Sequence, residues 1–371
     1  MTQTTAAAGL TPQQWDNKYF TEYLRNNPFK AYMGKGTSSI IQIKEDLTKK
    51  KGDSLTFALV NKLTGSANDG TSKLEGNEEA LGSRSHKLTV ALRRNGVSIT
   101  EFEDQISAID LRNAAKDQLM DWSMEQDVER IVAALYSKNG VAYGSATEAQ
   151  KDAWLDDNID RVLFGKAKSN VSTSAPAGGA TYDHSASLAN IDATNDKLTP
   201  EALSLMKRIA LSASPKIRPI RTESDNKRWF TVFAHPLAFR DLKNNATITQ
   251  AQREVSVATQ NNKLFQGGDL IWDGMIIHEV DEMTTLTNAG AGGAVDVGGV
   301  FLCGAQAFGL GIAKRWTTRT KGETDYGNEK GVAVVAIDGL NKLTFGSGSS
   351  DTADLKDHGV VTGYFAAVAD S

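Results

Sequence analysis

The sequence predicts an α+β fold, in which one very long helix stands beside several groups of short strands. A stretch without glycine or proline, 103–137, carries apolar residues at helical spacing. Two runs, 54–59 and 87–93, alternate between apolar and polar residues and predict a strand hairpin. The C-terminal part is rich in valine and aromatic residues, which is typical of further strands.

Composition and charge exclude several classes of protein. The chain has 371 residues, of which 40% are hydrophobic and 23% charged, so a sizeable core is expected. Its net charge of -4 argues against a protein whose main task is to wrap nucleic acid through a basic surface, although a container only has to tolerate DNA. Cys303 is the single cysteine, which excludes an intrachain disulfide and predicts a small buried side chain. No signal peptide or apolar membrane span is evident, so we expect folding in a cytoplasm.

The N-terminal segment is expected to be an arm. Thr11, Pro12 and Gln14 form a helix start, and Pro28 is expected to end that helix. The basic run 49–51 is interpreted as a solvated turn.

The predicted hairpin has an unusually long connection. Leu55, Phe57 and Leu59 share one face of its first strand, and Leu88, Val90 and Leu92 share one face of its second. The intervening residues 61–86 are polar, and loops longer than ~12–15 residues are uncommon and usually functional. A two-stranded hairpin is marginal alone in water. We therefore expect it to rest on another surface, such as a second copy of the chain.

The helix over 103–137 is expected to span roughly 50 Å at 1.5 Å per residue. Its apolar stripe is broken and its heptads are not sustained, which disfavours a coiled coil. Asn113 and Asp117 interrupt the stripe, whose members are Phe102, Ile106, Ile109, Met120, Met124, Val128, Ile131 and Leu135.

Shorter elements follow. Ser145 and Glu148 predict a capping box before a helix that carries Trp154 and Leu155 and ends near Phe164. A surface loop is expected at 166–197, and Thr199 with Pro200 predicts a helix through about Ala213. The remaining predictions are strands at 228–234, 275–280, 300–303, 331–337, 342–345 and 359–369, and a helix at 237–243.

No motif predicts chemistry. Gly34–Lys35–Gly36 and the pair Gly309 and Gly311 are incomplete phosphate-loop patterns, better explained by turns or close packing. The five histidines show no metal-ligand spacing, and Asp192, Thr194 and Asp196 form an incomplete calcium loop. We expect no catalytic, cofactor-binding or metal site, with His235 before Pro236 shaping a turn.

Five segments carry a family resemblance: 51–65, 74–81, 233–242, 303–310 and 325–328. Together they resemble the major capsid proteins of short-tailed and some long-tailed bacteriophages, over roughly 52–361. The resemblance implies the Hong Kong phage-type capsid fold and self-assembly into pentamers and hexamers. These would form an icosahedral shell around double-stranded DNA, assembled in the host cytoplasm as part of the virion.

The resemblance also implies a division of the chain. Its parts are an N-terminal arm (1–51), an extended loop (52–100), a spine helix of a peripheral domain (101–139), a mainly axial domain with interleaved peripheral segments (140–321), and C-terminal strands of the peripheral domain (322–371). The expected partners are other copies, a separate scaffolding protein and a portal, with room for a cement or decoration protein. No cofactor and no membrane are expected, and nothing marks a lysine–asparagine crosslink. The expected inter-subunit contacts of the loop are Leu63, Leu74, Glu75, Glu78, Glu79, Leu81 and Arg84.

Two other functions remain open from the sequence. An encapsulin-like bacterial nanocompartment shell would use the same fold, but the segment 74–81 is more similar to phage proteins. A soluble hydrolase using His235 belongs to a different class and lacks a recognisable nucleophile.

Overall fold

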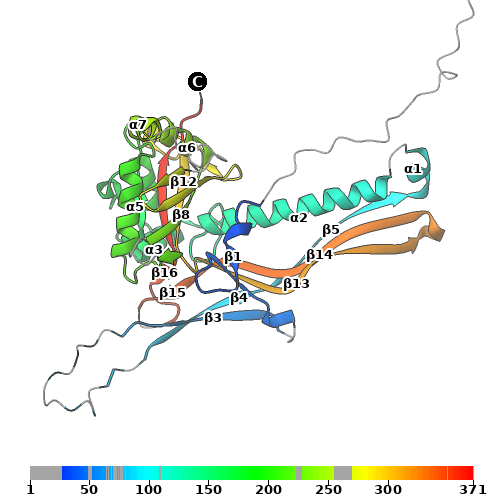
Figure 1. The fold of residues 1–371 in the computed structure, drawn as a ribbon, viewed down its shortest axis with the longest axis horizontal. Coiled ribbons are helices and arrows are strands. Elements are labelled where there is room, and N and C mark those ends of the chain that lie inside the picture. Colours follow the sequence, from blue (N-terminus) through cyan, green and yellow to red (C-terminus); the bar gives the residue numbers. More distant parts are fainter. Residues whose placement is uncertain are drawn as a thin grey trace, which may run out of the picture. The chain divides into compact units, whose positions relative to one another are not determined.

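The computed structural model places most of the chain in two compact units, whose elements are labelled in Figure 1. The larger unit comprises Pro28–Ala91, Val128–Ala313 and Asp338–Ser371, and the smaller one comprises Met1–Asn27, Leu92–Asp127 and Lys314–Ile337. The structure describes residues 27–48, 52–63, 65, 67, 69, 73, 75, 78–79, 81–107, 110–222, 228–254, 270–348 and 350–370. The helix expected from Thr11 lies outside these described residues.

An eight-stranded sheet forms the centre of the larger unit. Its path runs β6-β17-β12-β8-β10-β9, with β11 paired to β12 and β7 to β8. Every residue of β12 and β17 is buried, as expected for strands covered on both faces. The strands are β6 (Val162–Phe164), β7 (Arg221–Thr222), β8 (Arg228–Ala234), β9 (Leu270–Trp272), β10 (Met275–Glu279), β11 (Thr285–Leu286), β12 (Val297–Cys303) and β17 (Val360–Ala366).

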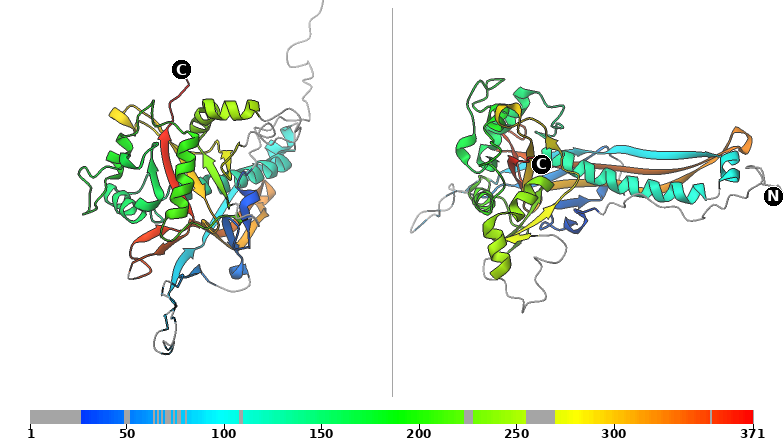
Figure 2. Two further views of the ribbon diagram at one scale, coloured as in Figure 1. Left: turned by 60° about the vertical axis from the view of Figure 1, so that its left-hand side comes forward. Right: turned by 90° about the horizontal axis from the view of Figure 1, so that it is seen from above.

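The two faces of this sheet have separate cores. Val300 and Leu302 of β12 pack with α5 (Pro200–Ser212) and α6 (Pro236–Lys243). Helix α5 lies along the sheet in Figure 2. Phe301 and Cys303 point to the other face, where they pack with Phe29 and the last turns of α2 (Leu111–Tyr136). Cys303 is fully buried, as predicted, and burial raises the pKa of its thiol.

The predicted helix at 200–213 is confirmed, since Thr199 accepts the Ala202 N–H and Pro200 occupies the first turn. The capping box before α3 (Glu148–Asn158) was predicted at the wrong residues. The Thr147 hydroxyl accepts the Gln150 N–H, and the Gln150 side-chain oxygen accepts the Thr147 N–H. This pair lies two residues beyond the expected one. Helix α3 also ends before Phe164, because Val162–Phe164 form β6. The 166–197 loop contains a short helix, α4 (His184–Ala189), and a further α-helix of this unit is α7 (Ala246–Glu254).

A hairpin of β3 (Ser54–Val60) and β4 (Ser83–Thr89) is present, with Ser54 opposite Thr89. Its second strand was predicted wrongly over 87–93, because β4 starts at Ser83 inside the expected loop and Leu92 belongs to β5. The apolar face of the hairpin does not need a second copy at its base. Phe57 and Leu88 are buried against Leu343 and Phe345 of the same chain. Two short strands, β15 (Thr344–Gly346) and β16 (Leu355–Asp357), lie in this region of the chain. The hairpin thus rests on another surface, as expected, but at its base this surface belongs to the same chain and not to a second copy.

A second sheet has the order β1-β2-β13-β14-β5. Strand β2 pairs in parallel with the start of β13, with Ile41 opposite Phe308. The sequence did not predict β5 as a strand of its own, predicted no strand over β13, and predicted only part of β14. Residues 314–321 of β13 alternate among lysine, arginine and threonine with Trp316 as the single large apolar residue, so they give no apolar period. The strands are β1 (Met33–Gly34), β2 (Ile41–Lys44), β5 (Ala91–Thr100), β13 (Phe308–Thr324) and β14 (Glu329–Lys342).

The smaller unit packs the first part of α2 on strands β13 and β14. Trp122 and Trp316 meet edge to face at 5.9 Å, beside a core of Leu119, Val332 and Val334. The Trp316 indole also donates to Asp127 over 3.2 Å. These contacts join the helix to the sheet within this unit.

The single helix predicted over 103–137 is two helices, α1 (Glu101–Ile106) and α2. Ser107 has extended backbone angles (φ -76°, ψ 135°), which end α1 without glycine or proline. The predicted apolar stripe is confirmed at Val128, Ile131 and Leu135, which are buried. It is wrong at Phe102 and Ile106 of α1, which are exposed, and at Met120 and Met124 of α2, where Leu119 and Trp122 pack against the sheet instead. Ile109 lies outside the described residues. The exposed fractions are 68% for Phe102, 66% for Ile106, 51% for Met120 and 38% for Met124.

Candidate functional site

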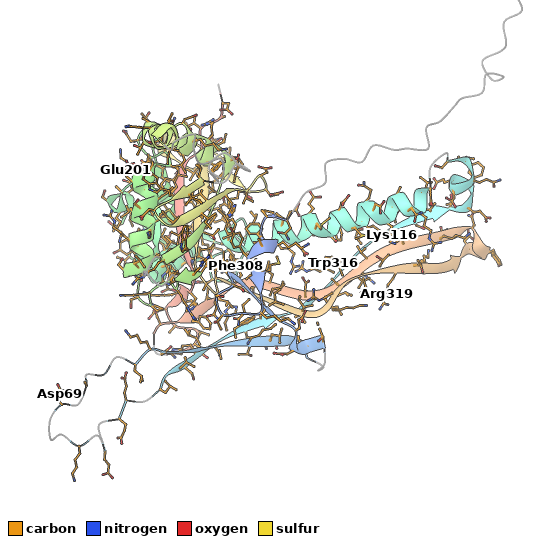
Figure 3. All side chains as sticks on the ribbon, in the orientation of Figure 1. Asp69, Lys116, Glu201, Phe308, Trp316 and Arg319 are labelled. Carbon is orange, nitrogen blue, oxygen red and sulfur yellow. The ribbon has the colours of Figure 1, made fainter. Side chains whose placement is uncertain are left out.

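The segment between β3 and β4, residues 61–82, is called the extended loop below. All of its described residues are exposed, and Asp69 lies at its far end (Figure 3). Three apolar side chains at its two ends face solvent, with exposed fractions of 60% for Val60, 53% for Leu63 and 67% for Leu81. Exposed apolar side chains gathered in one segment are typical of an interaction surface.

The extended loop is also acidic. Glu75, Glu78 and Glu79 are exposed, and Glu79 accepts the Gly65 N–H over 2.6 Å, which joins its two sides. Leu74, the remaining predicted contact in this segment, lies outside the described residues. The structure thus brings Leu63, Leu81 and the glutamates into one exposed segment.

Arg84 is placed differently from the other predicted contacts. Its guanidinium donates to the Gly348 carbonyl over 2.6 Å and lies 3.9 Å from an Asp351 carboxylate oxygen. Ser85 donates to the same carboxylate over 2.7 Å. Arg84 therefore anchors the base of the hairpin to its own chain.

The smaller unit carries a hollow on the face of its sheet that points away from α2. It measures about 680 Å³, and its four charged side chains are all basic, in a chain whose net charge is -4. Trp316 and Arg319 lie on opposite faces of β13, and Arg319 belongs to the hollow (Figure 3). We call this surface the basic hollow. It is lined by Leu92, Arg94, Asn95, Gly96, Lys314, Arg319, Thr320, Lys321, Ala333, Val335 and Ile337.

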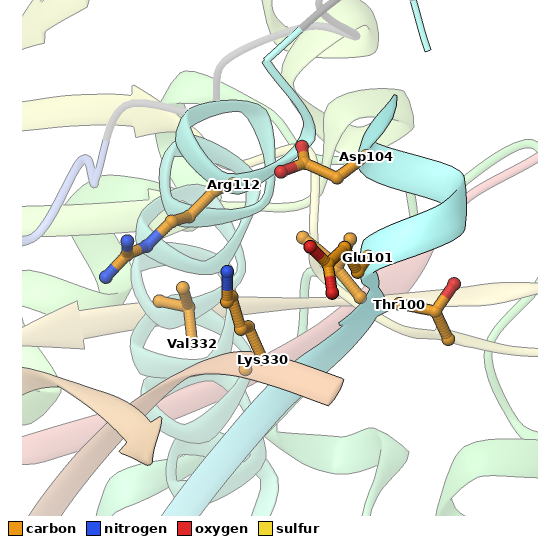
Figure 4. Close-up of a pocket in the computed structure, with 8 residues that line it drawn as sticks. Thr100, Glu101, Asp104, Arg112, Lys330 and Val332 are labelled. Atoms are coloured by element: carbon orange, nitrogen blue, oxygen red, sulfur yellow. The ribbon is translucent and has the colours of Figure 1, made fainter. Parts of the chain in front are cut away.

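A second cavity of the smaller unit is much smaller. Figure 4 shows Glu101 and Asp104 of α1 near Arg112 of α2 and Lys330 of β14 around it. Its volume of about 20 Å³ leaves room for roughly one water molecule. The mixed charges are thus part of a packed junction, with no room for an organic ligand.

His235 forms the N-cap of α6. Its Nδ1 accepts the Leu237 N–H over 3.3 Å, and its Nε2 lies 2.8 Å from the Thr285 hydroxyl oxygen. Burial lowers the pKa of the imidazole, which favours the neutral ring that a cap acceptor requires. The sequence indicated a turn here but not the cap.

The other weak motifs also have local explanations. Asp192 accepts the N–H groups of Thr194 and Asn195 within its own turn. Gly309 and Gly311 lie under Phe57 and Leu55 of the hairpin. Within the described part of the chain, no group of three or more His, Cys, Asp or Glu residues could hold a metal ion. Its helices include none with the length and apolar character needed to cross a membrane.

Comparisons with known proteins agree over nearly the whole chain. The family model described as phage capsid protein matches residues 3–369. The chain is 27% identical to the major capsid protein of Pseudomonas phage KPP25 over 392 residues, which cover 97% of each chain.

Solved structures give the same result. The cyanophage Pam1 capsid asymmetric unit matches with a TM-score of 0.86 and 32% identity over 100% of both chains. The capsid of Ralstonia phage GP4 matches with a TM-score of 0.73 and 20% identity, also over 100% of both. The Helicobacter pylori bacteriophage KHP30 capsid matches at a TM-score of 0.69 and 14% identity, over 97% of each. The last two show the fold alone, and the predicted α+β capsid fold is confirmed.

Proposed function

This chain belongs to the phage capsid protein family and is a major capsid protein of the virion, and from that premise we propose that its copies form both pentamers and hexamers. The observation that carries the proposal is the agreement in family and fold over the full length of the chain. Repeated contacts between different surfaces of one protein close into rings when the rotation between copies permits it. Rings of five and six would then close the shell around double-stranded DNA.

The proposed contact between copies uses the extended loop. Its apolar side chains, Leu63 and Leu81, are exposed in the single chain, and its three glutamates face solvent. The base of the hairpin is supported by Leu343 and Phe345, whereas Leu63 and Leu81 of the loop stay exposed. Contact with an adjacent copy would bury the apolar groups of the loop.

The basic hollow is the complementary surface that we propose for it. Arg94, Lys314 and Arg319 would face the glutamates of the loop, and Leu92, 57% exposed, would meet its apolar groups. The phosphate backbone of a nucleic acid would match the basic side chains of this lining but not its apolar side chains. Charge complementarity mainly sets register and partner choice between proteins.

A charge-reversal pair tests this contact. Arg94→Glu with Arg319→Glu, or Glu78→Lys with Glu79→Lys, is expected to stop shell assembly while leaving the monomer folded. Combining all four changes is expected to restore assembly at least in part. Lys216→Glu, an exposed site outside the hollow, is the control and should assemble normally. If both reversal pairs assembled into normal shells, the basic hollow would not be part of the contact between copies.

The structural role leaves no catalytic task to assign, and we propose that the chain is not an enzyme. The two alternatives from the sequence are not supported, since the relatives described above are phage capsid proteins rather than encapsulins or hydrolases. The arm, extended loop, peripheral and axial domains stay as a proposed division of the chain. A scaffolding protein, a portal and a cement protein likewise stay as predicted partners.

A further inference from the structure

Two lysines and one aspartate are buried together in the larger unit, next to the end of α2. Lys138 is 1% exposed, Lys342 3% and Asp357 0%. Lys138 follows α2 by two residues, Lys342 ends β14, and Asp357 ends β16. Two cations facing one carboxylate would leave a net positive charge in the core, so the two lysines need not carry the same charge.

Lys342 has the partners of an ammonium ion. Its Nζ lies 2.6 Å from Asp357 Oδ2 and donates to the Ser137 carbonyl over 3.0 Å. That carbonyl belongs to the C-terminal end of α2, where the helix dipole favours a positive charge. Trp154 donates to the same carboxylate oxygen over 3.2 Å. Lys342 and Asp357 therefore form the buried ion pair.

Lys138 has partners of a different kind. Its Nζ forms a 2.6 Å hydrogen bond with the Tyr364 hydroxyl and lies 3.1 Å from the centre of the Trp154 ring. The rings of Tyr143 and Tyr364 are farther away, at 5.8 and 5.2 Å. Aromatic rings attract a cation, but this gain is smaller than the cost of burying an ion without a counter-ion of its own.

The surrounding charges act in the same direction. Burial, followed by the charge of Lys342, holds the pKa of Lys138 well below its usual value. Asp357 raises this pKa by a smaller amount, and Lys151 on α3 lowers it further. His184 on α4 is also buried, and burial lowers its pKa, so its ring supplies no counter-ion to Lys138. Asp152 on α3 accepts the N–H groups of Ala177 and His184. Burial raises the pKa of Tyr364, which keeps its proton.

We propose that Lys138 is held as a neutral amine in the folded larger unit, so that unfolding takes up a proton and acid weakens the fold. A neutral amine keeps two N–H groups, so it can still donate to the Tyr364 hydroxyl oxygen over 2.6 Å. In the unfolded chain the same amine is protonated below about pH 10.4. Stability is therefore fully present above that pH and falls as the pH decreases toward the folded-state value. Each unit by which the pH falls in this window raises the unfolding equilibrium constant about tenfold, because unfolding takes up one proton.

The matched variants are Lys138→Met and Lys342→Met, each compared with the parent as the full-length unassembled chain. Denaturant unfolding is measured between about pH 7 and about pH 8.5. The unfolded Cys303 thiol titrates near the upper limit, but it does so equally in the parent and the variants and therefore cancels in the comparison. Lys138→Met is expected to remove close to a tenfold change in the unfolding constant per pH unit, and to be at least as stable as the parent at pH 7. Lys342→Met is expected to be less stable than the parent, because it leaves Asp357 buried without its cation.

A third variant separates charge from size. Lys138→Arg keeps a long side chain that stays protonated, so it is expected to raise the unfolding constant by more than tenfold at pH 7. The proposal is overturned by equal pH slopes in the parent and Lys138→Met, by a failure of Lys138→Met to fold, or by a stable Lys138→Arg protein. The readout is unfolding of the single chain, so it does not depend on whether copies assemble.

Discussion

The ring of Phe57 on β3 lies so close to the backbone of Gly309 on β13 that a side chain at position 309 would collide with it. An added Cβ at Gly309 would come within 2.8 Å of two ring carbons, and one at Gly311 within 2.5 Å of a Leu55 methyl carbon. The hairpin that carries the extended loop therefore packs directly against the backbone of Gly309 and Gly311 of the same chain. This contact fixes where the loop leaves the larger unit.

Gly309→Ala is therefore expected to lower the free energy of unfolding by about 1–3 kcal/mol, through overpacking against Phe57 and Leu343. Gly144→Ala is the control, since nothing lies within 4 Å of its added Cβ. Denaturant unfolding of both variants measures the difference. Equal stabilities would mean that the hairpin is not held by this contact.

Charge on the apolar stripe that the sequence predicted for α2 should matter at its C-terminal half only. Ile131→Asp would bury a carboxylate at a site that is 1% exposed, and we expect a loss of about 3 kcal/mol or more. Met124→Asp, at a site 38% exposed, is expected to cost about 1 kcal/mol or less in the single chain. Thermal unfolding separates the two, and a folded, fully stable Ile131→Asp protein would argue against burial of this stripe.

His235 should act through its cap acceptor. His235→Ala is expected to cost about 1 kcal/mol, whereas His235→Asn keeps an acceptor at the N-cap and should remain close to the parent. Damage by His235→Asn equal to that of His235→Ala in denaturant unfolding would argue against the cap.

The same residue gives a pH dependence. Because burial lowers its pKa in the fold, the unfolded chain binds the proton first, and the parent should lose stability as the pH falls below about 6.5. His235→Asn should lose less over the same range. If His235→Asn and His235→Gln both failed to assemble, and assembly of the parent depended on pH near that value, a protonation switch would replace the cap as the role of His235.

The extended loop should be needed for shells but not for folding. Deleting 66–82 is expected to abolish stable shells and leave a soluble monomer, because the base of the hairpin keeps its contacts with Leu343 and Phe345. Size-exclusion chromatography and circular dichroism give the two readouts. Shells of normal yield from the deletion variant would exclude the loop as an essential contact between copies.

The elements that the sequence predicted well have strong local signals. Thr199 with Pro200 marks the start of α5, and the alternation at Leu55 and Phe57 marks β3. Strand β13 was not predicted, because residues 314–321 pair through the backbone while their side chains are mostly charged or hydroxylated. The break between α1 and α2 has no glycine or proline to indicate it.

Contacts between distant residues could not be predicted in the same way. Arg84 was expected to reach another copy, yet its partners Gly348 and Asp351 lie more than 260 positions along the same chain. The bond between Lys138 and Tyr364 joins residues 226 positions apart. A single sequence carries no local pattern for such pairs, so only the fold shows them. The resemblance of the five segments predicted the family, which the comparisons confirmed.

Electron microscopy of the purified full-length protein, after assembly, tests the central claim most directly. We expect closed icosahedral particles in which the same chain forms rings of five and rings of six, with density from one copy over the smaller unit of its neighbour. Particles built only from dimers or other small species, or a protein that stays monomeric under every assembly condition, would contradict it.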